Sequence, residues 1–507
     1  MKPFVYRFKT NNFRYVYDVT TNNIIQVEAA IYEILEEVYN LNIEDIVSKY
    51  GCRYPAGEIR KAYNQILLQR DKFGMFRPND LLKINRPNSE KELVSKLENS
   101  LDQLILNVTE ECNLRCKYCV YSGSYYHERR HSKKHMSYSV GERAVRFFLD
   151  RCKQPVYGNT SINNSISFYG GEPLLDFNLV KKICEFAKKS AKEDILFSMT
   201  TNGTILSEEK INYLVNNKFF LLVSLDGPQK INDRYRITRN NKGTFDLVTR
   251  NLKKIREMNE KYYKENVHFS IVLAPPFRIE EVIDFFSAGN DLIAGNGTII
   301  NFMGQEDNRY SSLFNLYKKN LEEEFNKARQ CYIDLTTLGE KQSCTLNNLR
   351  KIFDPFLYRI HMRKLAPIGK EIRANGICVP GTRRLFVSVD GNFYPCEKMG
   401  ESIYLGNIYD GFDYDAIFGL IQSYVSISEE MCLKCWACRI CGLCYLSARK
   451  GNTLNKKRKE RNCRNALINY SLFMKLYCEI LEKNPDAFSY MYANVPRKLE
   501  TEILRQT

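Results

Sequence analysis

The sequence has no long apolar run and no export signal at its start. No apolar stretch reaches the roughly 18 residues that a membrane helix needs. The opening residues MKPFVYRFKTNNFRYVYD mix polar, charged and apolar side chains and do not resemble a signal peptide. Internal repeats and low-complexity segments are also missing. We therefore expect a soluble cytoplasmic protein without a membrane partner.

The 17 cysteines are unusual for a chain without an export signal. The cytosol is reducing, so clustered cysteines there more often bind metal or do redox chemistry than form disulfides. Residues 112–119 hold three cysteines and residues 432–444 hold five. The scattered thiols are most simply small buried hydrophobic residues; examples are Cys52, Cys152, Cys184 and Cys478.

The formal net charge is +16, which makes nucleic acid the obvious partner to consider. Lys and Arg are, however, spread along the chain, and the only dense run is NKKRKERNCR near residue 455. An acidic peptide segment would suit the same charge. We expect no nucleic-acid partner, although charge alone decides little.

The length of 507 residues predicts about three domains at roughly 150 residues each. Residues 4–28 have the pattern of strands around TNN turns, and residues 29–40, 43–51 and 55–74 have the pattern of helices. A hairpin with three short helices predicts a winged-helix-like module over residues 1–95. Residues 77–92 are polar and contain proline, which favours a linker.

Short apolar strands alternate with helices from residue 103 onward. The expected helices include 138–152, 174–191, 243–260 and 279–288, and the expected strands are 104–109, 165–171, 196–203, 220–227, 267–275 and 299–304. This alternation predicts an α/β fold with parallel βα units. Six units indicate a partial (β/α)6 TIM barrel over residues 96–305, with chemistry at the carboxyl ends of its strands.

The rest of the chain divides by composition. Residues 306–375 are charged and mostly helical and predict a bridging region, and residues 376–470 are cysteine-rich and less regular. A hairpin is expected to turn at Asp390 and Gly391. Residues 465–485 predict a helix, within a last segment of helix and tail over residues 471–507.

The first cysteine cluster, NVTEECNLRCKYC, follows the first expected barrel strand. Thiolates are soft ligands that select zinc or iron–sulfur clusters, and a structural zinc site uses four protein ligands. The three thiols of Cys112, Cys116 and Cys119 instead fit three irons of a [4Fe–4S] cluster and leave the fourth iron open.

This Cx3Cx2C pattern resembles the signature of the radical S-adenosylmethionine (radical SAM) enzymes. The resemblance implies that the open iron chelates S-adenosylmethionine and that one electron from the cluster releases a 5′-deoxyadenosyl radical. The ends of the later strands agree with this resemblance, since further family elements resemble YGGEP (169–173), TTNG (200–203) and SLDGP (224–228). The segment DRYR follows, and its Arg234 or Arg236 could pair with a carboxylate. The resemblance implies these cofactor-binding residues: Tyr118, Gly170, Gly171, Glu172, Ser198, Asn202 and Arg234.

The second cysteine set runs Cys378-x12-Gly391-x4-Cys396, then CLKCWACRICGLC (432–444), then Cys463. It resembles the SPASM domain, whose pattern is C-x9–15-G-x4-C, Cx2Cx5Cx3C and C, and which carries two auxiliary [4Fe–4S] clusters. Here the last pair is spaced Cx2C, and the additional Cys438 interrupts the x5 segment. A structural zinc domain is the alternative, since cysteines every third residue also suit zinc.

The SPASM resemblance implies a ligand set for each auxiliary cluster. The outer cluster would take Cys432, Cys435, Cys441 and Cys463, and the inner cluster would take Cys378, Cys396 and Cys444. The fourth inner ligand stays open: Cys344, Cys438, or an open iron that holds a substrate thiolate. Together with the first site, this implies three [4Fe–4S] clusters.

SPASM radical enzymes mostly modify peptides or proteins, and the N-terminal module resembles the element that captures leader peptides as an added strand. The resemblance implies a precursor-peptide maturase whose residues 1–95 bind the leader, with flavodoxin or ferredoxin as electron donor. We expect a thioether crosslink in a cysteine-containing peptide; no general base is indicated, and Asp226 and Glu397 are only nearby in the pattern. The alternatives are a sulfatase-maturase-like oxidase, a carbon–carbon crosslinking or epimerising maturase, and a zinc-containing nucleic-acid-binding regulator.

Overall fold

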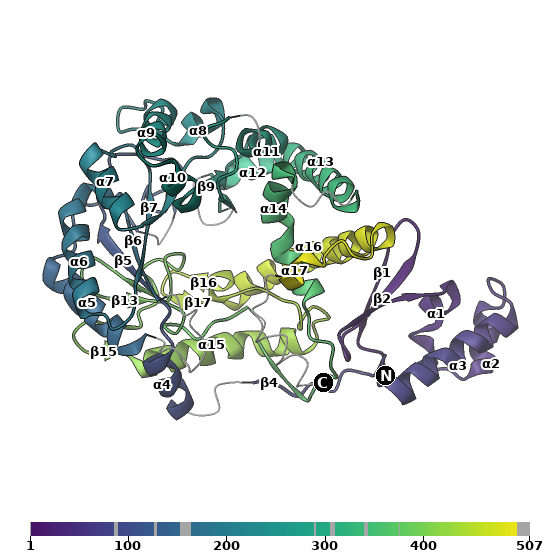
Figure 1. The fold of residues 1–507 in the computed structure, drawn as a ribbon. Coiled ribbons are helices and arrows are strands. Elements are labelled where there is room, and N and C mark those ends of the chain that lie inside the picture. The colour runs from purple at the N-terminus through teal and green to yellow at the C-terminus, as the bar shows by residue number, and fades with distance from the viewer. Residues whose placement is uncertain are drawn as a thin grey trace.

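The fold is built around one mixed sheet with helices on its outer side (Figure 1). The computed structural model describes residues 2–85, 90–125, 129–152, 164–287, 290–304, 310–338, 343–374 and 376–493. Within these residues, no helix is both long and apolar enough to span a membrane.

The central sheet contains all six strands that the sequence predicts, and they are parallel. These strands are β5 (Gln103–Thr109), β6 (Ser165–Gly170), β7 (Leu196–Thr201), β8 (Phe220–Ser224), β9 (Val267–Leu273) and β10 (Thr298–Phe302). They lie side by side in chain order, as a partial barrel requires. The sequence did not predict the continuation of the sheet beyond β5, where β12 (Arg384–Val387) pairs parallel to β5 and β13 (Phe393–Tyr394) pairs antiparallel to β12.

The helices between the strands cover the outer side of the barrel, at the left and top of Figure 1. They are α5 (Tyr138–Arg151), α6 (Phe177–Ser190), α7 (Glu208–Asn216), α8 (Gln229–Tyr235), α9 (Phe245–Met258), α10 (Glu260–Asn266) and α11 (Ile279–Ser287). Helix α5 shows why they form: the Ser137 hydroxyl accepts from the Val140 amide at its start, and its buried residues, such as Ala144 and Phe148, recur at helical spacing.

The N-terminal module projects at the right of Figure 1 and has a hydrophobic core of its own. Its elements are β1 (Val5–Lys9), β2 (Arg14–Asp18), β3 (Asn23–Val27), α1 (Ala29–Ile34), the short 3-10 helix η1 (Glu37–Tyr39), α2 (Ile43–Tyr50) and α3 (Ala56–Phe73). The predicted hairpin is in fact a three-stranded antiparallel meander, because β3 pairs along the whole of β2. The expected helix over residues 29–40 ends early and continues as η1.

The predicted linker over residues 77–92 contains regular structure. Residues Lys83–Asn85 form β4, which pairs parallel with β11 (Glu371–Arg373), and α4 (Glu90–Asn99) begins before the expected end of the linker. Residues 86–89 of this segment lie outside the described residues. The prediction of a polar, irregular connection was therefore wrong for its second half.

The helical prediction for residues 306–375 agrees with α12 (Ser311–Leu316), α13 (Lys318–Thr337) and α14 (Cys344–His361). In the cysteine-rich region the hairpin turns at Asp390 and Gly391, with Val387 opposite Phe393. The short pairs β14 (Gly406–Asn407) with β15 (Gly411–Phe412) and β16 (Arg449–Lys450) with β17 (Thr453–Leu454) follow.

Two long helices complete this region. The sequence did not predict α15 (Tyr414–Leu433), and the helix expected over residues 465–485 is α16 (Lys456–Lys483), which begins earlier because Asn455 caps it. After α16 comes the short α17 (Tyr490–Ala493), and residues 494–507 of the expected tail lie outside the described residues. Among the scattered thiols, Cys152, Cys184 and Cys478 are buried as expected, but Cys52 is exposed in the turn after α2.

Candidate active site

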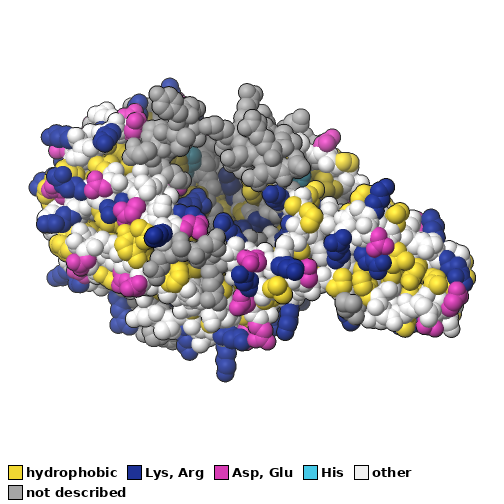
Figure 2. All heavy atoms as spheres, turned by 90° about the horizontal axis from the view of Figure 1, so that it is seen from below, with side chains coloured by type: hydrophobic (Ala, Val, Ile, Leu, Met, Phe, Trp, Pro, Cys, Tyr) yellow, Lys and Arg dark blue, Asp and Glu magenta, His cyan; other side chains and the backbone are white. Residues whose placement is uncertain are grey.

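The first cysteine cluster opens into a large cavity at the carboxyl ends of the barrel strands. The cavity has a volume of about 830 Å³. Cys112, Cys116 and Cys119 form part of its wall, and strand-end residues of β6 through β10, from Gly170 to Phe302, form the rest of the barrel side. This is the edge where a parallel barrel places its chemistry. Figure 2 shows the hollowed lower face of the molecule, with Lys and Arg side chains visible inside the hollow.

The thiols of this cluster are poorly hydrated. Burial raises the pKa of Cys112 to about 12 and that of Cys116 to about 11, while the nearby Arg236 guanidinium opposes the second shift. The Leu114 amide donates to Cys112 Sγ over 3.4 Å, and the Tyr121 amide donates to Cys119 Sγ over 3.4 Å. A metal that binds these sulfurs must displace their protons, and the amide donors then stabilise the thiolates.

The donor set fits a cluster with one open iron. Within the described residues, no three His, Cys, Asp or Glu side chains converge on a single metal ion. In a [4Fe–4S] cluster each cysteine binds a different iron, so the sulfurs surround the site without meeting at one point. Three thiols on the wall of one cavity match that requirement and leave room for a ligand on the fourth iron.

The two glycines of the YGGEP motif allow β6 to contact the cysteine loop. A Cβ atom on Gly170, which has φ of +147°, would lie 2.3 Å from the Thr109 carbonyl oxygen, and one on Gly171 would lie 2.2 Å from the Glu111 carbonyl oxygen. The Gly171 amide donates to Thr109 O over 2.7 Å. Only glycine permits this approach, so the motif and the cysteine loop form one structural unit.

Glu172 supports the cavity but does not line it, although the sequence suggested a direct cofactor contact. Its fully buried carboxylate accepts from the Asn202 amide and the Thr201 hydroxyl, both over 2.7 Å, and from the Leu174 amide over 3.1 Å. Burial raises its pKa in spite of these donors. Glu172 thereby fixes the end of β7, where the Asn202 side chain donates to Asn113 Oδ1 over 2.9 Å and lies on the cavity wall.

Tyr118, Asp226 and Arg236 form a buried trio beside the cysteines. The Tyr118 hydroxyl donates to Asp226 Oδ2 over 2.5 Å and accepts from the Arg236 guanidinium over 2.9 Å. The Val272 amide donates to the other Asp226 oxygen over 2.9 Å. Tyr118 and Arg236 line the cavity, and the buried Arg236 Nε atom has no hydrogen-bond partner among the described residues.

The structure does not bring every predicted cofactor residue to the cavity. Arg234 donates to the Pro276 carbonyl, and Ser198 shares a hydrogen bond of 2.5 Å with Ser167; neither lines the cavity. Of the two arginines that the sequence offered as a carboxylate partner, Arg236 lies on the cavity wall and Arg234 does not. The predicted residues that do share the cavity are Cys112, Cys116, Tyr118, Cys119, Gly170, Gly171, Asn202 and Cys444.

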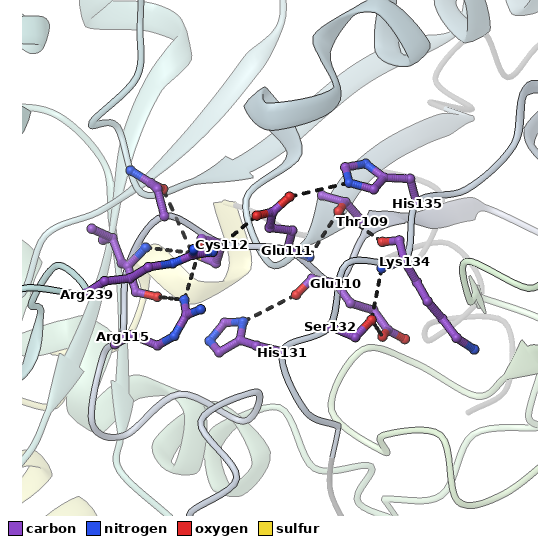
Figure 3. Close-up of polar contacts among 12 residues, drawn as sticks. Thr109, Glu110, Glu111, Cys112, Arg115, His131, Ser132, Lys134, His135 and Arg239 are labelled. Carbon is purple, nitrogen blue, oxygen red and sulfur yellow. Dashed lines mark hydrogen bonds and ion pairs between the residues drawn. The ribbon is translucent and has the colours of Figure 1, made fainter.

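Two arginines that sequence reasoning missed hold the outer side of the cysteine loop (Figure 3). Arg115 donates to the Cys112 carbonyl over 2.7 Å, and Arg239 donates to the same carbonyl over 3.2 Å. Arg239 also pairs with Glu111 over 3.2 Å, and Glu111 lies 3.5 Å from His135 Nε2. No motif spacing distinguishes these arginines from surface cations, because their role depends on the loop geometry.

The predicted outer cysteine set surrounds a second cavity of about 440 Å³. Four of its lining sulfurs belong to the predicted ligands, which are Cys432, Cys435, Cys441 and Cys463. Cys438, which the sequence left unassigned, is buried in the same wall. The structure therefore places Cys438 with the outer set, where the i, i+3 spacing of the CLKCWACRIC segment puts it.

Of the predicted inner set, Cys444 lines the large cavity, whereas Cys378 and Cys396 line neither cavity. Besides burial, the neighbouring Cys444 thiol raises the pKa of Cys378, and Cys378 in turn is among the groups that raise the pKa of Cys396 to about 11. Cys344 is exposed at the start of α14, which packs against α11 and β10, and it lines neither cavity.

Of the two carboxylates that the sequence pattern placed near the site, neither faces the large cavity. Asp226 is engaged by Tyr118 and Val272, as described above. Glu397 pairs with Arg384 over 3.2 Å. The described residues therefore offer no carboxylate base on the wall of the large cavity.

Comparison with known proteins agrees with this geometry. Residues 106–288 match the model of the Radical SAM superfamily. The cysteine-type anaerobic sulfatase-maturating enzyme of Clostridium novyi is 26% identical over 301 residues, which cover 59% of this chain and 74% of that protein. The radical SAM cyclopropyl synthase TigE of Paramaledivibacter caminithermalis is 24% identical over 269 residues, which cover 52% of this chain and 49% of that protein.

The fold likeness extends beyond the matched barrel. The solved structure described as native anSMEcpe with bound AdoMet superposes with a TM-score of 0.53 at 23% identity, covering 78% of this chain and 100% of that one. At this identity the likeness establishes the fold alone.

Proposed function

From the radical SAM domain that residues 106–288 form, we propose that this enzyme modifies a ribosomally made, cysteine-containing precursor peptide and forms a thioether crosslink. The supporting observation is that Cys112, Cys116 and Cys119 share one cavity with Cys444 of the second cysteine set. A peptide bound there would lie between the site that generates a radical and a site that can bind sulfur or accept an electron.

The cavity wall suggests which residues bind the cofactor. When loaded, the cluster and S-adenosylmethionine would supply a 5′-deoxyadenosyl radical that abstracts hydrogen. Gly170 and Gly171 would let the backbone approach the cofactor, and Asn202 would donate to it. Arg236, with its free Nε donor, is the better candidate than Arg234 for a carboxylate partner. Glu172 would act by holding Asn202.

The auxiliary sites favour two further clusters. The cavity at Cys432, Cys435, Cys441 and Cys463 has enough thiols for a closed four-cysteine cluster. The inner set of Cys378, Cys396 and Cys444 has three; of the two candidate fourth ligands, Cys438 lies on the wall of the outer cavity and Cys344 lines neither cavity. An open inner iron would bind the substrate thiolate, and flavodoxin or ferredoxin would supply electrons to the first cluster.

The N-terminal module favours a peptide substrate. Strand β3 lies at one edge of the three-stranded sheet and carries no charged residue, since it reads NIIQV. Natural proteins usually protect an open edge strand with charge, so an uncharged edge favours pairing with an added strand. Figure 2 shows hydrophobic side chains interspersed with basic and acidic ones on the visible face of the module, a surface that would suit an amphipathic leader.

The crosslinking reaction balances with one electron left over. The acceptor carbon would lose a hydrogen atom to the 5′-deoxyadenosyl radical, which becomes 5′-deoxyadenosine, the cysteine thiol would lose a proton, and a carbon–sulfur bond would form. The remaining electron would pass to an auxiliary cluster. The product peptide is lighter than its precursor by two hydrogens.

Mass spectrometry after coexpression tests the proposal. The substrate to use is a short cysteine-rich reading frame adjacent to the gene, expressed with the enzyme and with Cys116→Ala as the inactive control. We expect a loss of two hydrogens that blocks alkylation of one peptide cysteine. Unchanged mass with inverted stereochemistry would show epimerisation, and a two-hydrogen loss with every thiol still alkylated would show a carbon–carbon crosslink.

A second candidate is oxidation of a protein side chain, by likeness to relatives whose names state that they mature sulfatases. It is favoured by the length of the sequence match and by the shared fold. It predicts that a sulfatase peptide is oxidised by this enzyme with no need for a leader segment.

A further inference from the structure

Lys459 is a buried cation on the wall of the outer cysteine cavity. It lies in the first turn of α16, four residues before Cys463, and the residue is only 2% exposed. Its Nζ atom lies 3.0 Å from the Tyr424 hydroxyl and 3.9 Å from Cys463 Sγ. The same ammonium group lies 4.5 Å from the centre of the Tyr424 ring.

No carboxylate of the described residues pairs with Lys459. Burying an ammonium group is costly unless an opposite charge compensates it. Its ammonium group instead faces the Tyr424 hydroxyl and the Cys463 thiol. The lysine therefore points toward a sulfur of the predicted outer set, which becomes negative when it binds metal.

We propose that Lys459 compensates the charge of the outer cluster and raises its reduction potential. This inference rests on the outer [4Fe–4S] cluster of the proposed function. A cluster with four thiolates is an anion, and its reduction adds one more negative charge. Net charge and hydrogen bonds to the sulfurs set the potential of such clusters, and a cation about 4 Å from a ligand sulfur acts strongly in a poorly hydrated site. Lys459 therefore stabilises the reduced state more than the oxidised state.

The contacts around Lys459 connect the outer cysteine site to the inner one. The Tyr424 hydroxyl, which binds Lys459, donates to the Leu443 carbonyl over 3.1 Å. Leu443 lies between Cys441 of the outer set and Cys444 of the inner set, and it lines both cavities. By raising the potential of the outer cluster, Lys459 would favour transfer of an electron from the inner site to the outer site. That transfer would reduce the outer cluster by one electron and move the electron away from the peptide.

Redox titration followed by electron paramagnetic resonance tests this proposal without requiring turnover. The background is the Cys112→Ala/Cys116→Ala/Cys119→Ala protein, reconstituted with iron and sulfide, so that only the auxiliary clusters give signals. Lys459→Met removes the buried charge. Lys457→Met is the matched control, because it makes the same change of charge two residues away at an exposed position of the same helix. Lys459→Arg keeps the charge.

We expect Lys459→Met to shift the midpoint potential of one auxiliary cluster to a more negative value, while the other cluster and the Lys457→Met protein stay unchanged. Equal potentials in Lys459→Met and the background would overturn the proposal. Lys459→Met could instead lose about four irons per chain, the content of one cluster. In that case, a Lys459→Arg protein that keeps both the iron content and the potential of the background supports a requirement for charge. Loss in both variants shows a packing role and overturns it.

The iron content of the background protein separates this inference from the proposed function. About eight irons per chain indicate two auxiliary clusters, and the potentials then decide the role of Lys459. About four irons or fewer would contradict the proposed pair of auxiliary clusters before any lysine variant is made.

Discussion

Tyr6 of β1 stacks on Trp436, with ring centroids 3.9 Å apart and planes inclined by 10°. Trp436 is the single tryptophan of the chain and follows Cys435 directly on the wall of the outer cysteine cavity. Arg439, in the same segment, donates to the carbonyls of Val19 and Thr20 over 3.2 and 3.3 Å. The N-terminal sheet is thereby attached to the cysteine segment itself.

Trp436→Ala is expected to loosen this attachment. The substitution removes the stack, which contributes about 0.5–1.5 kcal/mol beyond its buried area, and it exposes the Tyr6 face. Limited proteolysis should release the N-terminal module faster than in the wild type, and iron reconstitution of the outer set should become less complete. Tyr409→Ala, at an exposed tyrosine of the cysteine-rich region, is the control. An unchanged cleavage pattern in Trp436→Ala would contradict the structural link.

Gly171→Ala is expected to abolish cleavage of S-adenosylmethionine. Its Cβ would lie 2.2 Å from the Glu111 carbonyl oxygen, so the cysteine loop must move away from β6. The measurement is 5′-deoxyadenosine release with dithionite, with iron content determined on the same sample. Gly419→Ala in α15 is the matched control, because a Cβ there meets nothing within 4 Å. Wild-type cleavage by Gly171→Ala would show that the close contact is not required.

Glu172→Gln tests the support of Asn202. The glutamine amide is nearly the same size as the carboxylate. Its NH₂ group, however, would face one of the N–H or O–H groups that now donate to the Glu172 carboxylate. A mismatched buried hydrogen bond costs about 1–3 kcal/mol, which corresponds to S-adenosylmethionine binding that is weaker by roughly 5-fold to 150-fold. Equilibrium dialysis of the reconstituted protein measures this, with iron content unchanged. Equal affinity would mean that Glu172 does not position the cofactor site.

Arg129 is expected to hold the inner cysteine segment to the barrel. Its guanidinium is buried, lies 4.7 Å from the Phe386 ring centre and 4.9 Å from that of Tyr121, and donates to the Glu397 carbonyl beside Cys396. Desolvated cation–π contacts contribute about 2 kcal/mol. Arg129→Met should lower the melting temperature and the iron content, and Arg129→Lys should restore part of both. Arg143→Met is the matched control, because Arg143 lies over the ring of the exposed Tyr409. Wild-type iron content in Arg129→Met would refute this role.

The sequence predicted the barrel well because its strands are short buried runs, four of which end in glycine-containing turns, and their order in the chain is their order in the sheet. It could not choose between Arg234 and Arg236, since that choice depends on where α8 ends. Arg234 lies in its last turn, whereas Arg236 follows the helix with extended backbone and turns to the cavity.

Burial of single charges was also beyond the sequence. Lys459 belongs to a run of basic residues, NKKRKER, in which only the fold separates a buried lysine from its exposed neighbours. Arg129 likewise lies in HERRHSKK, which has the composition of a solvated surface segment. The pairing of β12 with β5 depends on residues about 280 positions apart, such as Arg384 opposite Gln103, and no local pattern predicts it.

Hydrogen–deuterium exchange tests the proposed leader site on the N-terminal sheet. Binding of the precursor as an added strand should protect the amides of β3, because half of an edge strand's N–H groups face outward and would gain partners. Strand β1 is the internal control: it forms the other edge of this sheet, but α16 packs against it and Tyr6 contacts Ser471. We expect protection in residues 23–27 that exceeds any change in residues 5–9.

A truncated precursor without its leader supplies the second arm of that experiment. If β3 recognises the leader, the truncated peptide should leave β3 exchange unchanged while the full precursor slows it. Equal protection by both peptides would place recognition in the core segment, and no protection by either would remove the N-terminal sheet from substrate binding. In that last case the uncharged edge of β3 would need another partner, and oxidation of a leaderless protein substrate would become the better account of the enzyme.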